Sequence, residues 1–288
     1  YERWRIEVEV DSGVDTVSLY DANSKRIGEL TPLSTSTFSL DLAPRLWSAE
    51  KPCLYTLVLR KGSDIRMKRV GFRDVKVVGN AVLVNGRKVK FKGVNRHEAS
   101  PENGRAITRA DMLRDIELLK RYNFYMVRTA HYPDHRLWYD LCDRYGIYLM
   151  AEANVEAHEP GYGEKGLGRF PEWEHSICER NLRHVRFYRN HPSVMFWSMG
   201  NETGHGDVFR HAIAAVKELD PSRPVHWERG NVDADVDSAM YMTVDWLDRR
   251  GRYGDGLTNA FEKGYAEAQT AKKPFFMCEY SHAMGNAI

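Results

Sequence analysis

From Phe91 onward the chain repeats one pattern, a short apolar run followed by a helical segment, and this repetition restricts the fold more than any other feature. Runs of about four to eight apolar residues between turn signals are typical of strands buried in a parallel sheet. The run that begins at Phe91 is followed by others at 124–128, 147–150, 194–199, 225–228, 239–242 and 275–279. Seven parallel strands are therefore expected.

Seven strands with intervening helices are one short of a (β/α)₈ TIM barrel. We expect a barrel truncated before its eighth strand, because the sequence stops at Ile288. The two open edges would need cover from another chain or loop. A doubly wound open sheet is the structural alternative, but no GxGxxG or P-loop motif follows any expected strand, so nucleotide binding has no support.

Helix signals lie between these runs. Thr108 and Asp111 form a capping-box pattern at the start of a helix that ends before Asn123, and a second helix is expected over 134–145, before Gly146. Further helices are expected around Ile177, Leu182 and Val185, over 207–219, and around Phe261 and Tyr265, with a Gly-rich loop over 159–170.

The first seventy-odd residues alternate in the β manner, for example at Trp4, Ile6, Val8 and Val10. Closely spaced turns without helical periodicity predict an antiparallel sandwich of immunoglobulin size. Asn85-Gly86, between two apolar runs, predicts a hairpin. We therefore expect an immunoglobulin-like support domain over 1–75 and a catalytic barrel domain over 76–288.

Two of the expected strands end in a glutamate, Glu202 after Val194–Met199 and Glu279 after Phe275–Cys278. A glycosidase needs two carboxyls at one site, because one donates a proton to the leaving oxygen while the other stays ionised to attack or stabilise the sugar cation. Alternatively, either glutamate caps a helix or pairs with an arginine. The pair, in Gly-, Asn- and His-rich surroundings, favours catalysis.

Charge and composition exclude several other classes. Lys and Arg total 42 against 40 Asp and Glu, and no basic stripe indicates a nucleic-acid partner. The four cysteines have neither disulfide nor zinc spacing, and no stretch reaches the length of a membrane span. The chain begins mid-pattern at Tyr1 without a signal peptide, as expected of an excised piece of a longer protein.

Six ordered motifs resemble glycoside hydrolase family 2, and within it the large bacterial β-galactosidases. The resemblance covers essentially the whole chain and is strongest from residue 82. The motifs are Gly93-Val-Asn-Arg-His97-Glu98, Val127-Arg-Thr-Ala-His131-Tyr-Pro, Leu141-Cys-Asp-Arg-Tyr-Gly146, Glu152-Ala-Asn-Val-Glu156-Ala-His158, Trp197-Ser-Met-Gly-Asn-Glu202 and Cys278-Glu-Tyr-Ser-His-Ala-Met-Gly-Asn286.

The resemblance implies a retaining β-galactosidase that acts on terminal β-D-galactosides by double displacement. Glu202 would be the acid/base and Glu279 the nucleophile. Retention requires the two carboxyls to lie roughly 5–5.5 Å apart, which neighbouring strand ends can supply. Arg128 matches the family residue that keeps the nucleophile ionised, and a structural ion pair in the barrel mouth is compatible with that role.

The resemblance also implies sugar contacts. His97, His131 and His282 match positions that hydrogen-bond sugar hydroxyls, and Asn201 matches the residue that contacts the 2-hydroxyl. Tyr241 matches a tyrosine beside the nucleophile. For each histidine a satisfied structural side chain is the alternative, and for Tyr241 a packed strand aromatic.

A Mg²⁺ ion is implied at Glu156, His158 and the acid/base Glu202. Glu156 and His158 stand at i and i+2, so in extended chain both side chains point to one side. Histidine is an unusual ligand for Mg²⁺, which prefers oxygen. The ion would tune Glu202 electrostatically.

The sequence departs from the close relatives at His97-Glu-Ala-Ser100 and at Thr129-Ala130, neither of which touches the presumed chemistry. A β-glucuronidase or β-mannosidase with the same mechanism, and a noncatalytic carbohydrate-binding relative, are the alternatives. The isolated chain is expected to be poorly active, because subsite residues and a strand are missing. Its natural galactoside, a homo-oligomeric parent, and a cytoplasmic or periplasmic location are left open.

Overall fold

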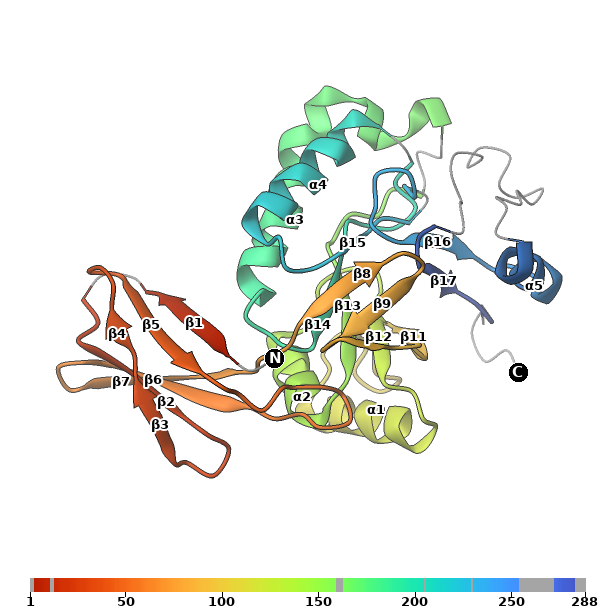
Figure 1. Cartoon of the computed structure of the whole chain (residues 1–288). Helices are drawn as coiled ribbons and strands as arrows, with labels where there is room; N and C mark the ends of the chain where they lie inside the picture. The colour runs from red at the N-terminus through yellow and green to blue at the C-terminus, as the bar shows by residue number, and fades with distance from the viewer. Residues whose placement is uncertain are drawn as a thin grey trace.

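A computed structural model describes residues 3–10, 13–158, 163–204, 206–228, 230–253 and 272–282 (Figure 1). Its first part is two antiparallel sheets, ordered β1-β5-β4 and β3-β2-β6-β7. The strands are β1 Trp4–Glu9, β2 Thr16–Tyr20, β3 Arg26–Glu29, β4 Thr31–Pro32, β5 Thr37–Leu42, β6 Tyr55–Lys61 and β7 Asp64–Val70.

The two sheets share one apolar core. Alternate residues of each strand face inward, as the period of two requires, and Val17, Leu19 and Leu57 are buried there. Tyr55 and Phe72 meet edge to face with ring centroids 5.2 Å apart. A two-layer β-unit therefore precedes the barrel, while its immunoglobulin-like character and the boundary at residue 75 stay predictions.

A small antiparallel sheet of β8 (Val75–Val78), β9 (Ala81–Val84) and β10 (Arg87–Lys88) follows. The hairpin predicted at Asn85-Gly86 is confirmed, and both residues have positive φ, 53° and 76°, as a tight hairpin turn demands. The second arm is shorter than expected because Phe91 leaves the hairpin and packs its ring against Tyr148 and Phe196 inside the barrel.

Seven parallel strands follow in the described part of the chain. Five form one sheet in chain order, β11 Gly93–Arg96, β12 Met126–Thr129, β13 Tyr148–Glu152, β14 Val194–Ser198 and β15 Val225–His226. The other two, β16 Asp237–Met240 and β17 Phe275–Glu279, pair with each other. The seven predicted strands are all present, although β14 ends at Ser198, before the turn that carries Glu202.

The first two helices lie beside the strands they precede. The predicted capping box is present in α1 (Arg109–Arg121), where Thr108 and Asp111 bond reciprocally. Helix α2 (Arg136–Tyr145) begins two residues later than predicted, because Asp134 accepts a bond from Arg96 at 2.7 Å instead of entering the helix. His135 caps α2, and Gly146 ends it with a left-handed conformation.

The next helices, α3 (Glu174–Tyr188) and α4 (Asp207–Leu219), agree with the prediction and pack against each other. The segment predicted as a loop contains short 3₁₀ turns at Gly163–Lys165, Leu167–Arg169 and Pro171–Trp173. Helix α5 (Val244–Tyr253) was not predicted. The helix predicted around Phe261 and Tyr265 lies outside the described residues.

The barrel interior has an apolar lower layer and a polar upper layer. Met126, Met150 and Phe196 lie in the lower layer with Val82 and Val84, so the β8–β9 hairpin closes this end. Two residues further along each strand, the period of two places polar side chains on the same face. These upper-layer residues are Arg128, Glu152 and Ser198, each at most 4% exposed.

The β-unit is attached to the barrel through α2 and β14 (Figure 1). The indole of Trp47, fully buried, donates to the Asp143 carbonyl at 2.8 Å, and the Arg73 guanidinium donates to the Val194 carbonyl at 2.8 Å. A Cβ atom at Gly146 would lie 2.1 Å from the Ala49 carbonyl oxygen, so the junction needs glycine there.

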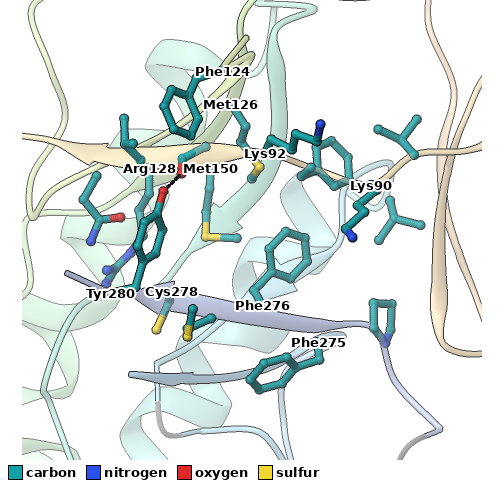
Figure 2. A pocket seen from close by; sticks show the side chains of 18 of the residues that line it. Lys90, Lys92, Phe124, Met126, Arg128, Met150, Phe275, Phe276, Cys278 and Tyr280 are labelled. Atoms are coloured by element: carbon teal, nitrogen blue, oxygen red, sulfur yellow. Dashed lines mark hydrogen bonds between the residues drawn. The ribbon is translucent and has the colours of Figure 1, made fainter. Parts of the chain in front are cut away.

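A cavity of about 590 Å³ lies between β11 and β17 (Figure 2). Residues of both strands line it, together with apolar side chains that include Phe276 and Met126. At one end of the cavity the Tyr280 hydroxyl donates to the Gly93 carbonyl at 2.5 Å, and Arg128 lies beside Tyr280. Of the helices in the described residues, none is long and apolar enough to cross a membrane.

Candidate active site

The predicted site residues lie at or just after the C-terminal ends of the parallel strands. Parallel strands end at one edge of a sheet, and loops at that edge of a barrel converge on one mouth. The structure therefore brings together side chains that are far apart in the sequence. They come from or directly follow β11 (His97), β12 (Arg128, His131), β13 (Glu156, His158), β14 (Asn201, Glu202), β16 (Tyr241) and β17 (Glu279, His282).

Arg128 is the centre of the site. Its Nε donates to Glu152 Oε2 at 2.7 Å, its Nη2 to Asn201 Oδ1 at 2.6 Å and its Nη1 to Glu279 Oε1 at 3.3 Å. Burial would lower the pKa of Arg128, but the charges of Glu152 and Glu279 outweigh burial and raise it. One buried cation thus connects the strand of Glu279 with the turn of Glu202.

The Glu279 carboxylate is held from several sides. Besides Arg128, the Tyr241 hydroxyl donates to its Oε2 at 2.5 Å, and His131 Nε2 lies 3.7 Å from its Oε1. Burial, the hydrogen bond to Glu279 and the charges of Glu279 and Glu202 all raise the pKa of Tyr241. The phenol therefore stays protonated and acts as a hydrogen-bond donor. The charges of both carboxylates, Glu279 and Glu202, act on it.

Glu202 sits on a tight turn after β14. Its φ is 48°, a left-handed conformation uncommon for a residue with a side chain. Gly200 (φ 146°) permits the turn, since a Cβ atom there would lie 2.5 Å from the Val155 carbonyl oxygen. The Glu202 side chain is 17% exposed, with Oε2 2.9 Å from His158 Nδ1.

Glu156, His158 and Glu202 form a group of possible metal ligands. One donor atom from each lies within 4.8 Å of the others, close enough for a single cation to contact all three. Asn201 Nδ2 donates to Glu156 Oε2 at 3.1 Å and so orients that carboxylate. Two carboxylates and one imidazole suit a divalent cation, and the residues present fit the implied Mg²⁺.

The three predicted sugar-binding histidines have different surroundings. His131 Nδ1 donates to the Glu152 carboxylate, with 2.8 Å between Nδ1 and Oε1, and the peptide bond between Ala130 and His131 is cis. The ring of His97 meets that of His131 edge to face at 5.5 Å, and burial lowers the pKa of His97. The exposed His282 lies further along, with its ring 6.0 Å from that of Tyr241.

Sequence reasoning missed the role of Glu152, which is fully buried beneath these side chains. Its carboxylate accepts from Arg128 and, at 2.6 Å, from the Ser198 hydroxyl, and it bonds His131. Burial would raise the pKa of Glu152, but Arg128, His131 and Ser198 together lower it to about 2. The alternation of side chains along a strand could have indicated this, since Glu152 follows Met150 by two residues and therefore points to the same inward face.

His226 extends this buried network on β15. Its Nδ1 lies 2.8 Å from the Ser198 hydroxyl, which donates to Glu152. Burial, with the charge of Arg128, lowers the pKa of His226 to about 3, so the ring is neutral. Because the His226 ring is neutral, it adds no positive charge to the upper layer beside that of Arg128.

A parallel barrel with two carboxyls at its mouth, one bonded by a buried arginine that also holds the residue next to the other, is typical of a glycosidase. The chain belongs to glycoside hydrolase family 2. The model of that family described as "Glycosyl hydrolases family 2, TIM barrel domain" matches residues 75–288. The fold and the family therefore agree with the resemblance seen in the motifs.

Similar curated proteins carry the name β-galactosidase. "Beta-galactosidase BgaC" of Bifidobacterium adolescentis is 38% identical over 94% of this chain, and a β-galactosidase of Vibrio vulnificus is 37% identical over 100% of it. These matches cover 27% and 29% of the two relatives, so the chain spans less than a third of their length.

Similar solved structures include enzymes named β-glucuronidase and β-galacturonidase. A β-D-glucuronidase of Dictyoglomus thermophilum matches with a TM-score of 0.74 and 22% identity, over 99% of this chain and 53% of that one. A family 2 β-galacturonidase of Eisenbergiella tayi, bound to galacturonate, matches with a TM-score of 0.68 and 26% identity, over 95% and 52%. The first of these likenesses concerns the fold alone.

Proposed function

We propose that the whole protein is a retaining β-galactosidase in which Glu279 is the nucleophile and Glu202 the acid/base. The observation that carries the proposal is the placement of Arg128, which donates to Glu279 and, through Asn201, fixes the residue next to Glu202. Two carboxyls on one barrel mouth are what double displacement requires. The names of the relatives at 36–39% identity favour galactoside as the substrate.

In the first step Glu279 attacks the anomeric carbon while Glu202 donates its proton to the glycosidic oxygen, so the aglycone leaves as an alcohol. In the second step Glu202 accepts a proton from water, which displaces Glu279 and gives the sugar with retained configuration. Arg128 and Tyr241 donate hydrogen bonds to the Glu279 carboxylate, and these bonds stabilise the negative charge that returns to it as the bond to the sugar breaks.

The residues around Glu279 are proposed to bind the sugar. His131, with His97 against its ring, lies near Glu279 Oε1, and His282 lies beside Tyr241, which bonds Glu279 Oε2, so hydroxyl groups of a bound galactosyl unit have several donors and acceptors around the nucleophile. Asn201 is proposed to contact the 2-hydroxyl, where a hydrogen bond that strengthens in the transition state lowers the barrier.

Glu156, His158 and Glu202 are proposed to hold Mg²⁺ in the whole protein. When bound, the cation supplies positive charge beside Glu202, which adjusts how readily that carboxyl gives up its proton. Removing divalent cations with a chelator should therefore slow hydrolysis, most for aglycones that are poor leaving groups, and adding Mg²⁺ should restore the rate.

A uronidase or mannosidase of the same mechanism is the second candidate, and the likeness to the β-galacturonidase of Eisenbergiella tayi favours a uronidase. The test compares hydrolysis of aryl β-galactoside, β-glucuronide and β-mannoside by the whole protein, with Glu279→Gln as the control. A higher kcat/KM for galactoside, lost in Glu279→Gln by at least about a thousandfold, is the expected result. Preference for glucuronide or mannoside would replace the substrate and keep the mechanism.

A further inference from the structure

On one side, the turn that carries the acid/base packs against the segment that follows β13. The backbone N–H of Asn201 donates to the Val155 carbonyl at 2.9 Å, and Gly200 approaches the same carbonyl closely. The next residue, Glu202, takes the left-handed conformation with φ 48°. Because this conformation is disfavoured for residues with a Cβ atom, neighbouring contacts must maintain it.

On its other side the turn is held by two consecutive residues after β15. The backbone N–H of Glu202 donates to Glu228 Oε2 at 3.0 Å, and Trp227 Nε1 donates to the Thr203 hydroxyl at 3.0 Å. Trp227 and Glu228 are each 1% exposed and Thr203 is fully buried. Both contacts therefore form away from bulk water, which would otherwise compete for them.

The support for these contacts is rigid. The Trp227 ring stacks on Phe209 of α4, with ring centroids 4.7 Å apart and planes 19° apart. On the same ring, a Cβ atom at Gly230 would lie 1.8 Å from an indole carbon, so glycine is required for the close approach. The end of β15 is thus fixed on α4 and offers a fixed carboxylate to the turn.

We propose that Glu228 is a positioning residue for the acid/base, and that its carboxylate oxygen holds Glu202 in the left-handed conformation by accepting its N–H. The inference rests on the proposed role of Glu202. The backbone conformation of Glu202 sets the direction of its side chain, and proton donation depends on the alignment of that carboxyl with the glycosidic oxygen. The Glu228 side chain is long enough to place its acceptor oxygen at hydrogen-bond distance from the Glu202 N–H.

Two substitutions separate the effect of the side-chain length of Glu228 from the effect of its charge. Glu228→Gln keeps an acceptor oxygen at the same distance along the side chain and removes the charge, whereas Glu228→Asp keeps the charge and withdraws the acceptor by one methylene. Both are made in the whole protein and tested with phenyl and 2,4-dinitrophenyl β-galactosides. The dinitrophenolate departs without protonation, so its kcat/KM does not need a correctly placed acid.

The expected result is that Glu228→Asp lowers kcat/KM for the phenyl galactoside by roughly tenfold to a hundredfold and for the dinitrophenyl galactoside by less than about threefold. Glu228→Gln should stay within about threefold of wild type on both substrates. Equal losses on both substrates in Glu228→Asp, or a Gln variant as impaired as the Asp variant, would overturn the proposal.

A crystal structure of the Glu228→Asp protein tests the same inference without relying on activity. The φ of Glu202 should leave the left-handed region in this variant, while Glu228→Gln retains it. An unchanged Glu202 conformation in Glu228→Asp would contradict the role. If wild type hydrolyses neither galactoside, the proposed function fails, and the structures still decide the role of Glu228.

Discussion

At the scale of single residues, the site depends on a carboxylate that does not face the substrate. Glu152 is fully buried and accepts from Arg128, Ser198 and His131, so its charge is neutralised by partners that themselves point to the mouth. Its pKa of about 2 lies below the ordinary 4.5. The stabilisation is therefore present above about pH 4.5 and is lost as the pH falls toward 2.

Removing this carboxylate should destabilise the protein strongly. Glu152→Ala leaves the buried Arg128 with one fewer counter-charge, and breaking a buried ion pair on one side costs about 3–5 kcal/mol. Urea unfolding at pH 7 measures the change. The control is Glu117→Ala, which removes a surface pair with Arg121 whose side chains are more than half exposed, and should cost less than about 1 kcal/mol. Equal losses would contradict the account.

Some residues of the candidate site could be predicted from the sequence and others could not. Glu202 and Glu279 end apolar runs and were found from that position, and motif resemblance added Arg128, Asn201 and the histidines. Glu152 and Glu228 were not recognised because their partners lie on other strands, at Arg128 and at the Glu202 backbone. A single sequence shows which residues end a strand, but contacts across strands depend on register and on turn geometry.

At the scale of elements, helix α3 packs on the sheet through a histidine. His184 is 4% exposed, with its ring 5.3 Å from that of Trp197 on β14 and 5.3 Å from that of Tyr188. Burial lowers its pKa from 6.5 to about 4. Because the unfolded chain binds a proton near pH 6 and the folded chain does not, this contact loses stability as the pH falls from about 6.5 to 4.

His184→Phe should remove this pH dependence while keeping a ring in the packing. Relative to the variant, wild type should lose up to about 1.4 kcal/mol of unfolding free energy per pH unit below pH 6.5. Urea unfolding of both proteins at pH 7.5, 6 and 5 gives the comparison. Parallel curves for the two proteins would show that His184 does not carry the effect.

The elements differ in how well the sequence predicts them. Helix α4 keeps its predicted bounds because its amphipathic pattern is undisturbed, whereas α2 begins late because Asp134 pairs with Arg96. Helix α5 was missed since its buried face includes Arg250, paired with Asp237, instead of an apolar residue. In α2 and α5, ion pairs with residues distant in the sequence determine the structure where the local hydrophobic pattern does not predict it.

At the scale of the whole molecule, the β-unit and the barrel meet at a point that tolerates no side chain. Gly146 combines a positive φ of 71° with the close approach to the Ala49 carbonyl. Lys120 Nζ donates to the Gly146 carbonyl at 2.7 Å, and Trp47 donates to Asp143 nearby. The C-terminus of α2 is thus both a helix end and a docking point.

Gly146→Ala should cost more than its backbone conformation alone explains. Gly62 has a similar φ of 55° with nothing within 4 Å of a Cβ atom, so Gly62→Ala measures the conformational cost, about 1–2 kcal/mol. Gly146→Ala adds a clash with fixed backbone and should lose at least about 2 kcal/mol more. The losses of unfolding free energy in Gly146→Ala and Gly62→Ala are compared. Equal losses would mean that the backbone at the junction shifts at no cost to admit the methyl group.

The measurement that tests the central claim most directly is covalent trapping of Glu279. The whole protein is incubated with a 2-deoxy-2-fluoro-galactosyl fluoride, and intact and peptide masses are recorded. The 2-fluorine slows both steps of a double displacement, while the good fluoride leaving group keeps the first step fast enough for the covalent intermediate to accumulate. We predict one added fluorogalactosyl unit on the peptide that contains Glu279, and none in Glu279→Gln. A label on Glu202, or hydrolysis of aryl galactoside with inverted configuration and no label, would contradict the account.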